Sequence, residues 1–369
     1  MKATSDYITR AGRIIYAGIL FLAISLQGCL KNDLVNEPVK GAENTAEMLV
    51  YFESQGDYIN SLETPWVIGA KEVNDNLKNY LIIDTRPAYQ FFSGHVPGAL
   101  NIQSEDLLNK LKGMNWQEYQ KIVLISSSGQ AAVYYATLLR LSGYNNVYSL
   151  KYGMAAWNRD FSDVWIQAVT NSPLMSTFTN ASVHKGEMTQ LPVVSFRTTS
   201  SNIKDKIEER VSDLLKLGFT DEDKSLNSIT IESPSIRTSQ VFSDTSSIAG
   251  KYYLVCYGNG ELYLAMGAFN PYSGLGHPRQ AVLYAQSSEL RSGRELQTMP
   301  TDKAIVIYCY DGLLSAAVTA YLRVLGYDAK SMLFGANALF YSRMLYDPVL
   351  KPHSFIASDV NSYAYETGN

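Results

Sequence analysis

The sequence lacks the usual marks of a nucleic-acid-binding, metal-binding or nucleotide-binding protein. It has no long basic run and a formal charge of −4, so nucleic acid is not expected as a partner. No glycine-rich phosphate loop of the P-loop or dinucleotide type occurs, and no cofactor is predicted. Its four histidines share no short spacing with a cysteine, so no metal site is predicted either; they are His95, His184, His277 and His353.

The N-terminus is not expected to be part of the fold. A basic start precedes an apolar stretch, residues 14–26, which has about the length of a signal-peptide core and is short for a bilayer span. It ends in Leu26-Gln27-Gly28-Cys29, which resembles the bacterial lipobox. The resemblance predicts a lipoprotein signal peptide over residues 1–28 and lipidation of Cys29. The alternative is an ordinary signal peptide with an incidental cysteine.

Residues 29–43 are polar and are predicted to be a tether. Within them, Lys31-Asn32-Asp33 is similar to the signal that directs lipoproteins of Bacteroidetes type to the cell surface. We therefore expect an exported protein, lipid-anchored to the outer membrane on its periplasmic side or at the cell surface. The membrane is then a partner through the lipid anchor, and the sequence identifies no protein partner.

The remaining chain alternates short apolar runs with helical patterns, which predicts an α/β fold with parallel sheets. Residues 81–83 and 122–125 are fully apolar and indicate buried strands, and an apolar helix over 131–141 is closed by Gly143. Asn44, with Glu47 three residues later, predicts a capped helix start. A further amphipathic helix is predicted from Ile203 to Leu215, closed by Gly218.

An internal repeat divides the chain into two copies of one unit. Residues 122–144 match residues 305–327 at an offset of 183, so that Gly129 corresponds to Gly312 and Arg140 to Arg323. The repeat predicts two domains with a polar linker between them and a tail after the second. The expected boundaries are 44–170 for the first domain, 171–202 for the linker, 203–345 for the second domain and 346–369 for the tail.

The first copy resembles the rhodanese-like family. It has a strand that ends in Asp84-Thr85-Arg86, followed by the motif Gly94-His95-Val96-Pro97-Gly98-Ala99. The resemblance covers roughly residues 45–165, and the repeat extends it more weakly over 203–345. It implies an α/β fold class with two rhodanese-like domains, each a parallel sheet flanked by helices. It also implies that Asp84 and Arg86 tie the strand end to neighbouring loops and that His95 is structural.

Rhodanese-like domains carry sulfur on a cysteine in a loop between a strand and a helix. Backbone N–H groups of such a loop, with the positive end of the helix dipole, favour a thiolate and then a persulfide. In the first copy, Ser126 stands where this cysteine belongs and Gly129 follows in the loop. A serine hydroxyl does not hold transferable sulfur, so the first domain is predicted to be catalytically silent.

In the second copy, Cys309 occupies the cysteine position and is the predicted catalytic residue. Its active-site loop consists of Tyr310, Asp311, Gly312, Leu313, Leu314 and Ser315. The loop contains no Lys or Arg, and Asp311 adds a negative charge where an anion should bind. Related phosphatases need an arginine where Ser315 stands, so phosphatase activity is not expected.

Three functions remain open at the level of sequence. The first is a sulfurtransferase that carries sulfane sulfur on Cys309, with a small sulfur donor or a thiol acceptor as its partners. The second is a non-catalytic binding or scaffold protein built on the same fold. The third is a redox pair, in which Cys256, at the end of a neighbouring strand, acts as a resolving thiol for Cys309.

Overall fold

The computed structural model describes residues 42–220, 233–242 and 251–368. The predicted signal peptide, Cys29 and nearly all of the tether lie outside the described residues. The chain divides into two units, Met1–Ala42 and Glu43–Asn369, and the second unit holds all the elements that form the candidate site. Within the described ranges, no helix combines the length and the apolar character needed to cross a membrane.

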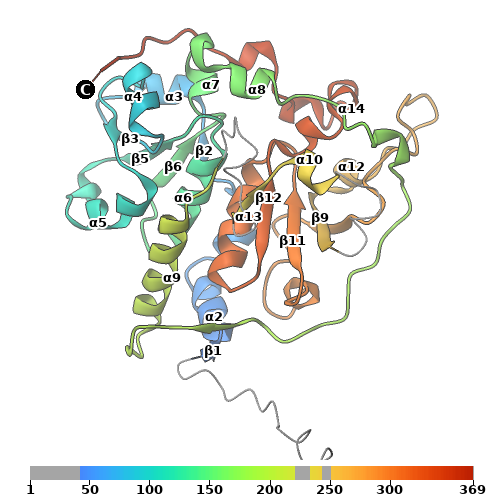
Figure 1. Ribbon diagram of the computed structural model, residues 1–369, viewed down its shortest axis with the longest axis horizontal. Helices are drawn as coiled ribbons and strands as arrows, with labels where there is room; N and C mark the ends of the chain where they lie inside the picture. The colour runs from blue at the N-terminus through green and yellow to red at the C-terminus, as the bar shows by residue number, and fades with distance from the viewer. Residues whose placement is uncertain (1–41, 221–232, 243–250, 369) are drawn as a thin grey trace, which may run out of the picture. The chain divides into compact units, whose positions relative to one another are not determined.

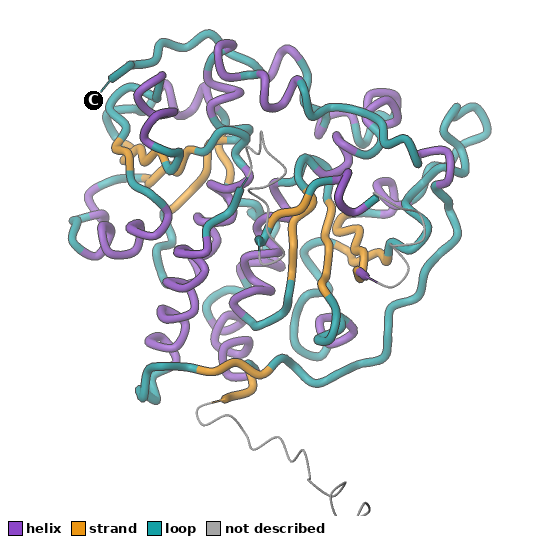
Figure 2. The backbone as a smooth tube through the Cα atoms, viewed as in Figure 1, coloured by secondary structure: helices purple, strands orange, loops and turns teal. Residues whose placement is uncertain are grey.

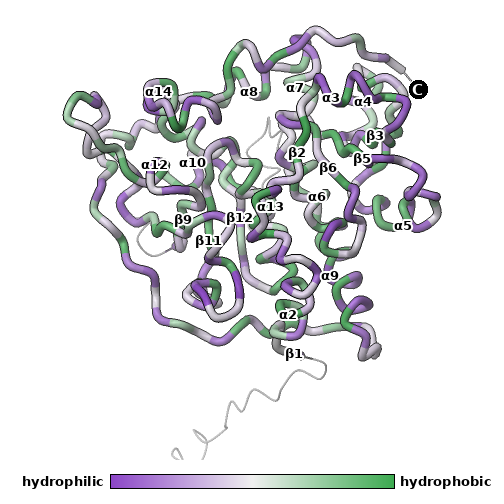
Figure 3. The backbone as a smooth tube through the Cα atoms, turned by 180° about the vertical axis from the view of Figure 1, so that it is seen from behind, coloured by the Kyte–Doolittle hydropathy of each residue, from purple (hydrophilic) through white to green (hydrophobic). Residues whose placement is uncertain are grey.

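The first sheet has five parallel strands in the order β2-β6-β5-β3-β4. Its central strand pair is β3 and β5, which are buried along nearly their whole length, as their continuous apolar sequences predict. Figure 3 shows both strands coloured as hydrophobic. The strands are β2 (Val67–Ile68), β3 (Tyr80–Asp84), β4 (Leu100–Asn101), β5 (Lys121–Ile125) and β6 (Val147–Leu150). The helices around them are α3 (Ala70–Asp75), α4 (Ala88–Ser93), α5 (Leu107–Lys112), α6 (Gln130–Leu141), α7 (Met154–Trp157) and α8 (Asp163–Ile166).

The second sheet repeats this topology, with the order β10-β9-β11-β12-β8 and all strands parallel. Read from β8, each strand occupies the place of the strand of the first sheet that matches it in the sequence repeat. The strands are β8 (Ser235–Ile236), β9 (Tyr252–Gly258), β10 (Val282–Ala285), β11 (Ala304–Tyr308) and β12 (Ala329–Met332). The helices are α10 (Thr238–Val241), α12 (Gly260–Tyr263), α13 (Leu313–Val324) and α14 (Tyr341–Tyr346). The predicted α/β fold with two repeated parallel-sheet domains is therefore confirmed.

Helices α6 and α13 pack along each other between the two sheets (Figure 1). Both are almost entirely buried, which explains why their sequences are apolar around most of the helix surface. Each helix begins directly after the loop that follows the central strand of its sheet. The packing of α6 on α13 therefore brings the Ser126 loop and the Cys309 loop into the same part of the molecule.

Two further helices pack beside this central pair. Helix α9 (Ile203–Leu217) contacts α6, α13 and α2, and it buries Ile207, Val211, Leu214 and Leu215, while Ile203 is half-buried. Helix α2 (Ala46–Ser54) buries Phe52 against Tyr321 of α13. The predicted capping box at Asn44 is wrong, because Asn44 ends strand β1 (Ala42–Asn44) and the helix begins after Thr45 without a side-chain cap.

Two segments cross between the domains, and we call them the first strap (residues 170–180) and the second strap (residues 355–366). The first strap follows the first domain and pairs with the second domain, and the second strap does the reverse. Figure 2 shows that both run largely as loop, as does the connection onward to β7 (Val193–Ser195), which pairs with β1. The antiparallel bridges are Asn171 to Phe340 and Thr179 to His277 for the first strap, and Ser362 to Asn158 and Glu366 to His95 for the second. The two straps thus occupy corresponding places on the two repeats.

Candidate active site at Cys309

Cys309 directly follows strand β11, and its side chain is completely buried. Its Sγ accepts hydrogen bonds from the backbone N–H groups of Gly312 and Ser315, each at 3.2 Å. Gly312 has a positive φ of 84° and caps the N-terminus of α13, a conformation that glycine adopts without strain. The sulfur therefore lies in a cradle of backbone donors at a helix N-terminus, as the sequence predicts.

The Ser126 loop of the first domain has the same geometry around an oxygen atom. Ser126 Oγ accepts hydrogen bonds from the N–H groups of Gly129 at 3.1 Å and Ala132 at 3.2 Å. Gly129 has a positive φ of 87°, matching that of Gly312. The same cradle therefore holds an oxygen atom in the first loop and a sulfur atom in the second.

The electrostatics of the second loop oppose ionisation of the thiol. Burial, together with the nearby Asp311 carboxylate, raises the pKa of Cys309 to about 11. Asp311 Oδ1 lies 3.9 Å from Sγ and accepts a hydrogen bond from the N–H of Leu313 at 3.1 Å. Burial also raises the pKa of Asp311, while the positive charge of Lys151 acts in the opposite direction. In the first loop, Ser128 takes the place of Asp311 and brings no charge.

The first domain supplies part of the cover over the Cys309 loop. Gln130 Oε1 accepts a hydrogen bond from the N–H of Phe334 at 2.8 Å and lies close against Gly312. Tyr152 is buried, and this burial is the main reason that its pKa is raised. The nearby Asp311 and Cys309 raise the pKa of Tyr152 further. The sequence did not identify Gln130, Lys151 or Tyr152 as site residues, because they belong to the other domain.

The segment after the second domain covers the loop from another side. The ring of His353 stacks on Tyr310 with a centroid distance of 4.3 Å. The amide of Asn337 donates to the carbonyls of Tyr310 at 2.9 Å and His353 at 3.0 Å, and accepts from the N–H of Phe355 at 2.9 Å. Phe355 in turn stacks on Trp165 of the first domain at 4.9 Å. A substrate can therefore reach the fully buried sulfur only after part of this cover moves.

Cys256 and Cys309 are both free and buried, so the structure holds no bridge between them. The register of β9 against β11 places Cys256 opposite Tyr308, the residue before Cys309. Burial raises the pKa of Cys256 to about 12. A resolving role for Cys256 stays a prediction. It requires that the Cys256 thiol, which is fully buried, come within bonding distance of the Cys309 sulfur at the ends of the two strands.

The equivalent of Cys256 in the first domain is Asp84, which pairs with Arg86 at 2.6 Å. Arg86 also donates to the carbonyl of Gly94 at 2.6 Å, so these two residues tie the strand end to the next loop, as the resemblance implies. His95 is structural as well, since its Nδ1 lies 2.8 Å from the carbonyl oxygen of Phe91 and its ring stacks on that residue.

In the second domain, Arg343 of α14 takes the role of Arg86. It is completely buried and donates to the carbonyl of Gly276, which corresponds to Gly94 in the repeat. Its other bonds go to the carbonyls of Glu261 at 2.6 Å, Leu262 at 3.2 Å and Leu264 at 2.8 Å. Burial lowers the pKa of Arg343, and no carboxylate pairs with it among the described residues. This replacement could not be predicted from the sequence, because the arginine comes from a different element.

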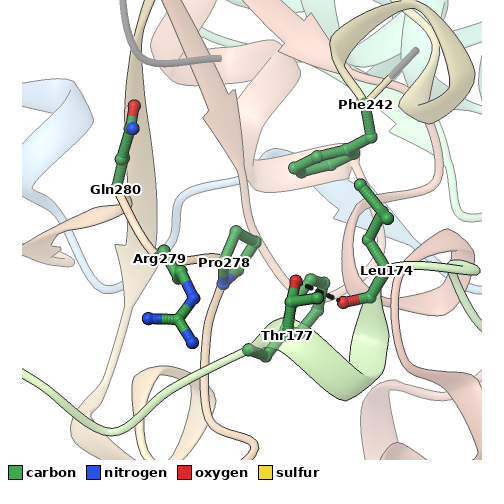
Figure 4. Close-up of a pocket in the computed structure, with 7 residues that line it drawn as sticks. Leu174, Thr177, Phe242, Pro278, Arg279 and Gln280 are labelled. Carbon is green, nitrogen blue, oxygen red and sulfur yellow. Dashed lines mark hydrogen bonds between the residues drawn. The ribbon is translucent and has the colours of Figure 1, made fainter. Parts of the chain in front are cut away.

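The cavities in the described parts of the second unit include two that border the straps. One, of about 210 Å³, is lined by Leu174, Thr177 and Phe178 of the first strap, by Phe242 and by the turn Pro278–Gln280 (Figure 4). The other, of about 520 Å³, lies along the second strap and includes Phe355 in its wall. The described residues contain no cluster of three His, Cys, Asp or Glu side chains that could hold a metal ion.

Comparison with known proteins places these features in a family. Residues 69–160 match the rhodanese-like domain family. They include strands β3 to β6 of the first sheet and the Ser126 loop. The chain is 30% identical over 81 residues to the thiosulfate sulfurtransferase GlpE of Shewanella oneidensis, which it covers over 78% of that protein's length. The chain belongs to the rhodanese-like family. The family resemblance predicted from the sequence is thereby confirmed.

This rhodanese-like protein also has relatives at lower sequence identity. It is 24% identical over 143 residues to the tRNA uridine(34) hydroxylase of Buchnera aphidicola, and spans only 40% of that protein. Among solved structures, it is similar to the thiosulfate sulfurtransferase of Pseudomonas aeruginosa, with 13% identity and a TM-score of 0.27. That alignment covers 86% of this chain and 48% of the other. A rhodanese-related protein from Thermoplasma volcanium aligns with 23% identity and a TM-score of 0.23, over 25% of this chain and 88% of the other.

Proposed function

We propose that this protein is a sulfurtransferase that carries sulfane sulfur as a persulfide on Cys309, with a catalytically silent first domain. The observation that carries the proposal is the pair of backbone N–H groups, from Gly312 and Ser315, that donate to the sulfur at the start of α13. Such donors stabilise negative charge on sulfur in the thiolate and in the persulfide. The relative named as a thiosulfate sulfurtransferase supports the same activity.

The experiment that tests this function is incubation with thiosulfate, followed by mass analysis of the peptide that contains Cys309. The wild-type protein should gain one sulfur atom on Cys309 and transfer it to cyanide. Cys309→Ser should do neither, while Ser126→Ala should leave the transfer unchanged. Equal transfer by Cys309→Ser and wild type would rule the enzyme out.

The second candidate is a non-catalytic binding or scaffold protein, and the complete burial of Cys309 favours it. The raised pKa of this thiol and the adjacent Asp311 point the same way, because both reduce the thiolate fraction. If no donor places sulfur on Cys309 at any pH at which the protein stays folded, this second function is the correct one.

We also propose that the mature protein is attached to the outer membrane through lipid on Cys29. The support for this anchor is the lipobox-like sequence Leu26-Gln27-Gly28-Cys29. Multiple acyl chains hold a protein on a bilayer where a single chain does not. Cys29→Ala should release the protein from the membrane fraction or leave its signal peptide uncut. An unchanged membrane fraction would overturn the anchor without affecting the sulfur chemistry.

A further inference from the structure

The cavity of about 520 Å³ lies between the second strap and the part of the first domain around α8. We propose that it binds the sulfur acceptor, and that this acceptor is an organic thiol with an apolar body and an anionic group. The inference rests on the proposed sulfurtransferase function, because it assigns the substrate class of the same site. The residues that decide the assignment are Arg159, Ile166, Val169, Phe355 and Val360.

Much of the wall of this cavity is apolar. Ile166 and Val169 come from α8 and the turn after it, and Phe355 and Val360 come from the second strap. Ile166 is 54% exposed, which is unusual for an isoleucine beside a cavity of this size. Apolar walls do not stabilise the binding of a small, strongly hydrated inorganic anion. They do favour the binding of an organic group, because its apolar surface is removed from water.

One cation at the cavity has no partner in the described part of the chain. The side chain of Arg159 makes no hydrogen bond or ion pair with any described residue, although it lines the cavity. Two carboxylates of this region, Asp359 and Asp160, bond to other groups. Asp359 accepts the N–H of Ile356 at 2.8 Å, and Asp160 accepts the hydroxyl of Tyr365 at 2.8 Å. A carboxylate on the ligand would complete a charge-assisted, bidentate pair with Arg159.

Contacts of Phe355 link the cavity to the Cys309 loop. Phe355 lies in its wall, and its ring packs edge-on against Tyr152 at 5.2 Å between centroids. The N–H of Phe355 donates to Asn337 at 2.9 Å, and the Asn337 amide donates to the carbonyl of Tyr310, the residue after Cys309, at 2.9 Å. With its anionic group at Arg159, a ligand would therefore present its other end toward Phe355. Rotation of the Phe355 ring would open the way to the persulfide.

The transfer step needs no reagent beyond the acceptor and the persulfide. The acceptor thiolate attacks the outer sulfur of the Cys309 persulfide, and a new sulfur–sulfur bond forms on the acceptor. The bond between the two sulfurs on Cys309 breaks, and its electron pair stays with the Cys309 sulfur. One thiolate and one persulfide anion are consumed and one of each is produced, so atoms, electrons and charge balance.

The test compares acceptors in the full-length protein after Cys309 has been loaded with sulfur from thiosulfate. The probes are para-mercaptobenzoate, which has the anionic group, and thiophenol, which lacks it. Arg159→Gln should lower the ratio of kcat/KM for para-mercaptobenzoate to kcat/KM for thiophenol by about tenfold. Arg159→Lys should restore part of the ratio. Ile166→Asp, at a half-exposed position that tolerates the change, should lower the ratio as well by repelling the carboxylate.

The matched control is Arg294→Gln, because Arg294 is also exposed and unpaired among the described residues but does not line the cavity. It should leave the ratio as in the wild type. A ratio that Arg159→Gln and Ile166→Asp leave unchanged, in protein that still forms the persulfide, would overturn the acceptor site alone. Absence of the persulfide itself would instead overturn the sulfurtransferase function on which this inference rests.

Discussion

The side-chain oxygen of Gln130, the first residue of α6, accepts a hydrogen bond from the backbone N–H of Phe334 at 2.8 Å. This bond joins the Ser126 loop of the first domain to the second domain beside Cys309. The same oxygen lies only 2.1 Å from the position that a Cβ atom on Gly312 would take. The first domain therefore shapes the Cys309 loop directly, although it holds no cysteine of its own.

We expect Gly312→Ala to destabilise the protein, because the new methyl group meets Gln130 and the residue has a positive φ. Gln130→Ala should remove the side-chain part of this conflict. In a double-mutant cycle, the two changes should therefore couple by about 0.5–3 kcal/mol. Urea unfolding of the four proteins measures this coupling energy. Strictly additive losses would show that Gln130 does not constrain the loop.

The pH dependence of Cys309 follows from its pKa of about 11, above the ordinary thiol value. Since only the thiolate reacts, alkylation by iodoacetamide should accelerate by about tenfold for each pH unit up to that pKa. Asp311→Asn keeps an oxygen for the N–H of Leu313 and removes the negative charge. It should lower the thiol pKa and raise the rate at pH 8 roughly threefold or more.

The control for this profile is Asp302→Asn, at an exposed carboxylate outside the Cys309 loop. It should leave the profile of Cys309 unchanged. If the alkylation profile of Asp311→Asn has the same midpoint pH as the wild type, Asp311 does not govern the acidity of the thiol. Burial alone then accounts for the raised pKa of Cys309.

Ser126→Cys, made together with Cys309→Ser, would place a thiol in the cradle of the first domain. The donors from Gly129 and Ala132 are present there, and Ser128 brings no charge where Asp311 stands in the second loop. We expect this thiol to be more acidic than Cys309 and to be alkylated faster at pH 8. Peptide-resolved mass spectrometry compares the two rates. A slower reaction at position 126 would mean that the residues packed over the loop limit the reactivity of the thiol, and that the charge of Asp311 does not.

Arg343 should be essential for the stability of the second unit. Arg343→Met leaves the carbonyls of Glu261, Gly276 and Leu264 without their buried donor. Each hydrogen bond to a charged group contributes about 1.5–3 kcal/mol, so the free energy of unfolding should fall by at least about 3 kcal/mol. Urea unfolding measures this loss. Arg294→Met, at the surface, should change it by less than about 0.5 kcal/mol, and equal values for both variants would contradict the assignment.

The sequence by itself determined the elements and their repetition. Apolar runs at 81–83 and 122–125 became buried central strands, and the offset of 183 became two sheets of one topology. Gly129 and Gly312 also have the backbone conformation that the loop motif requires. These features depend on residues close together in the chain, where periodicity and backbone preference act directly.

Only the tertiary structure decided what surrounds Cys309. Gln130 and Tyr152 reach the loop from the other domain, and His353 and Phe355 reach it from the segment after α14. In the same way, Arg343 of α14 bonds the carbonyl that corresponds to the one bonded by Arg86 of the loop after β3. None of these residues belongs to a motif around the cysteine. They meet because α6 packs on α13 and the straps cross between domains, and such long-range packing leaves no local pattern in the sequence.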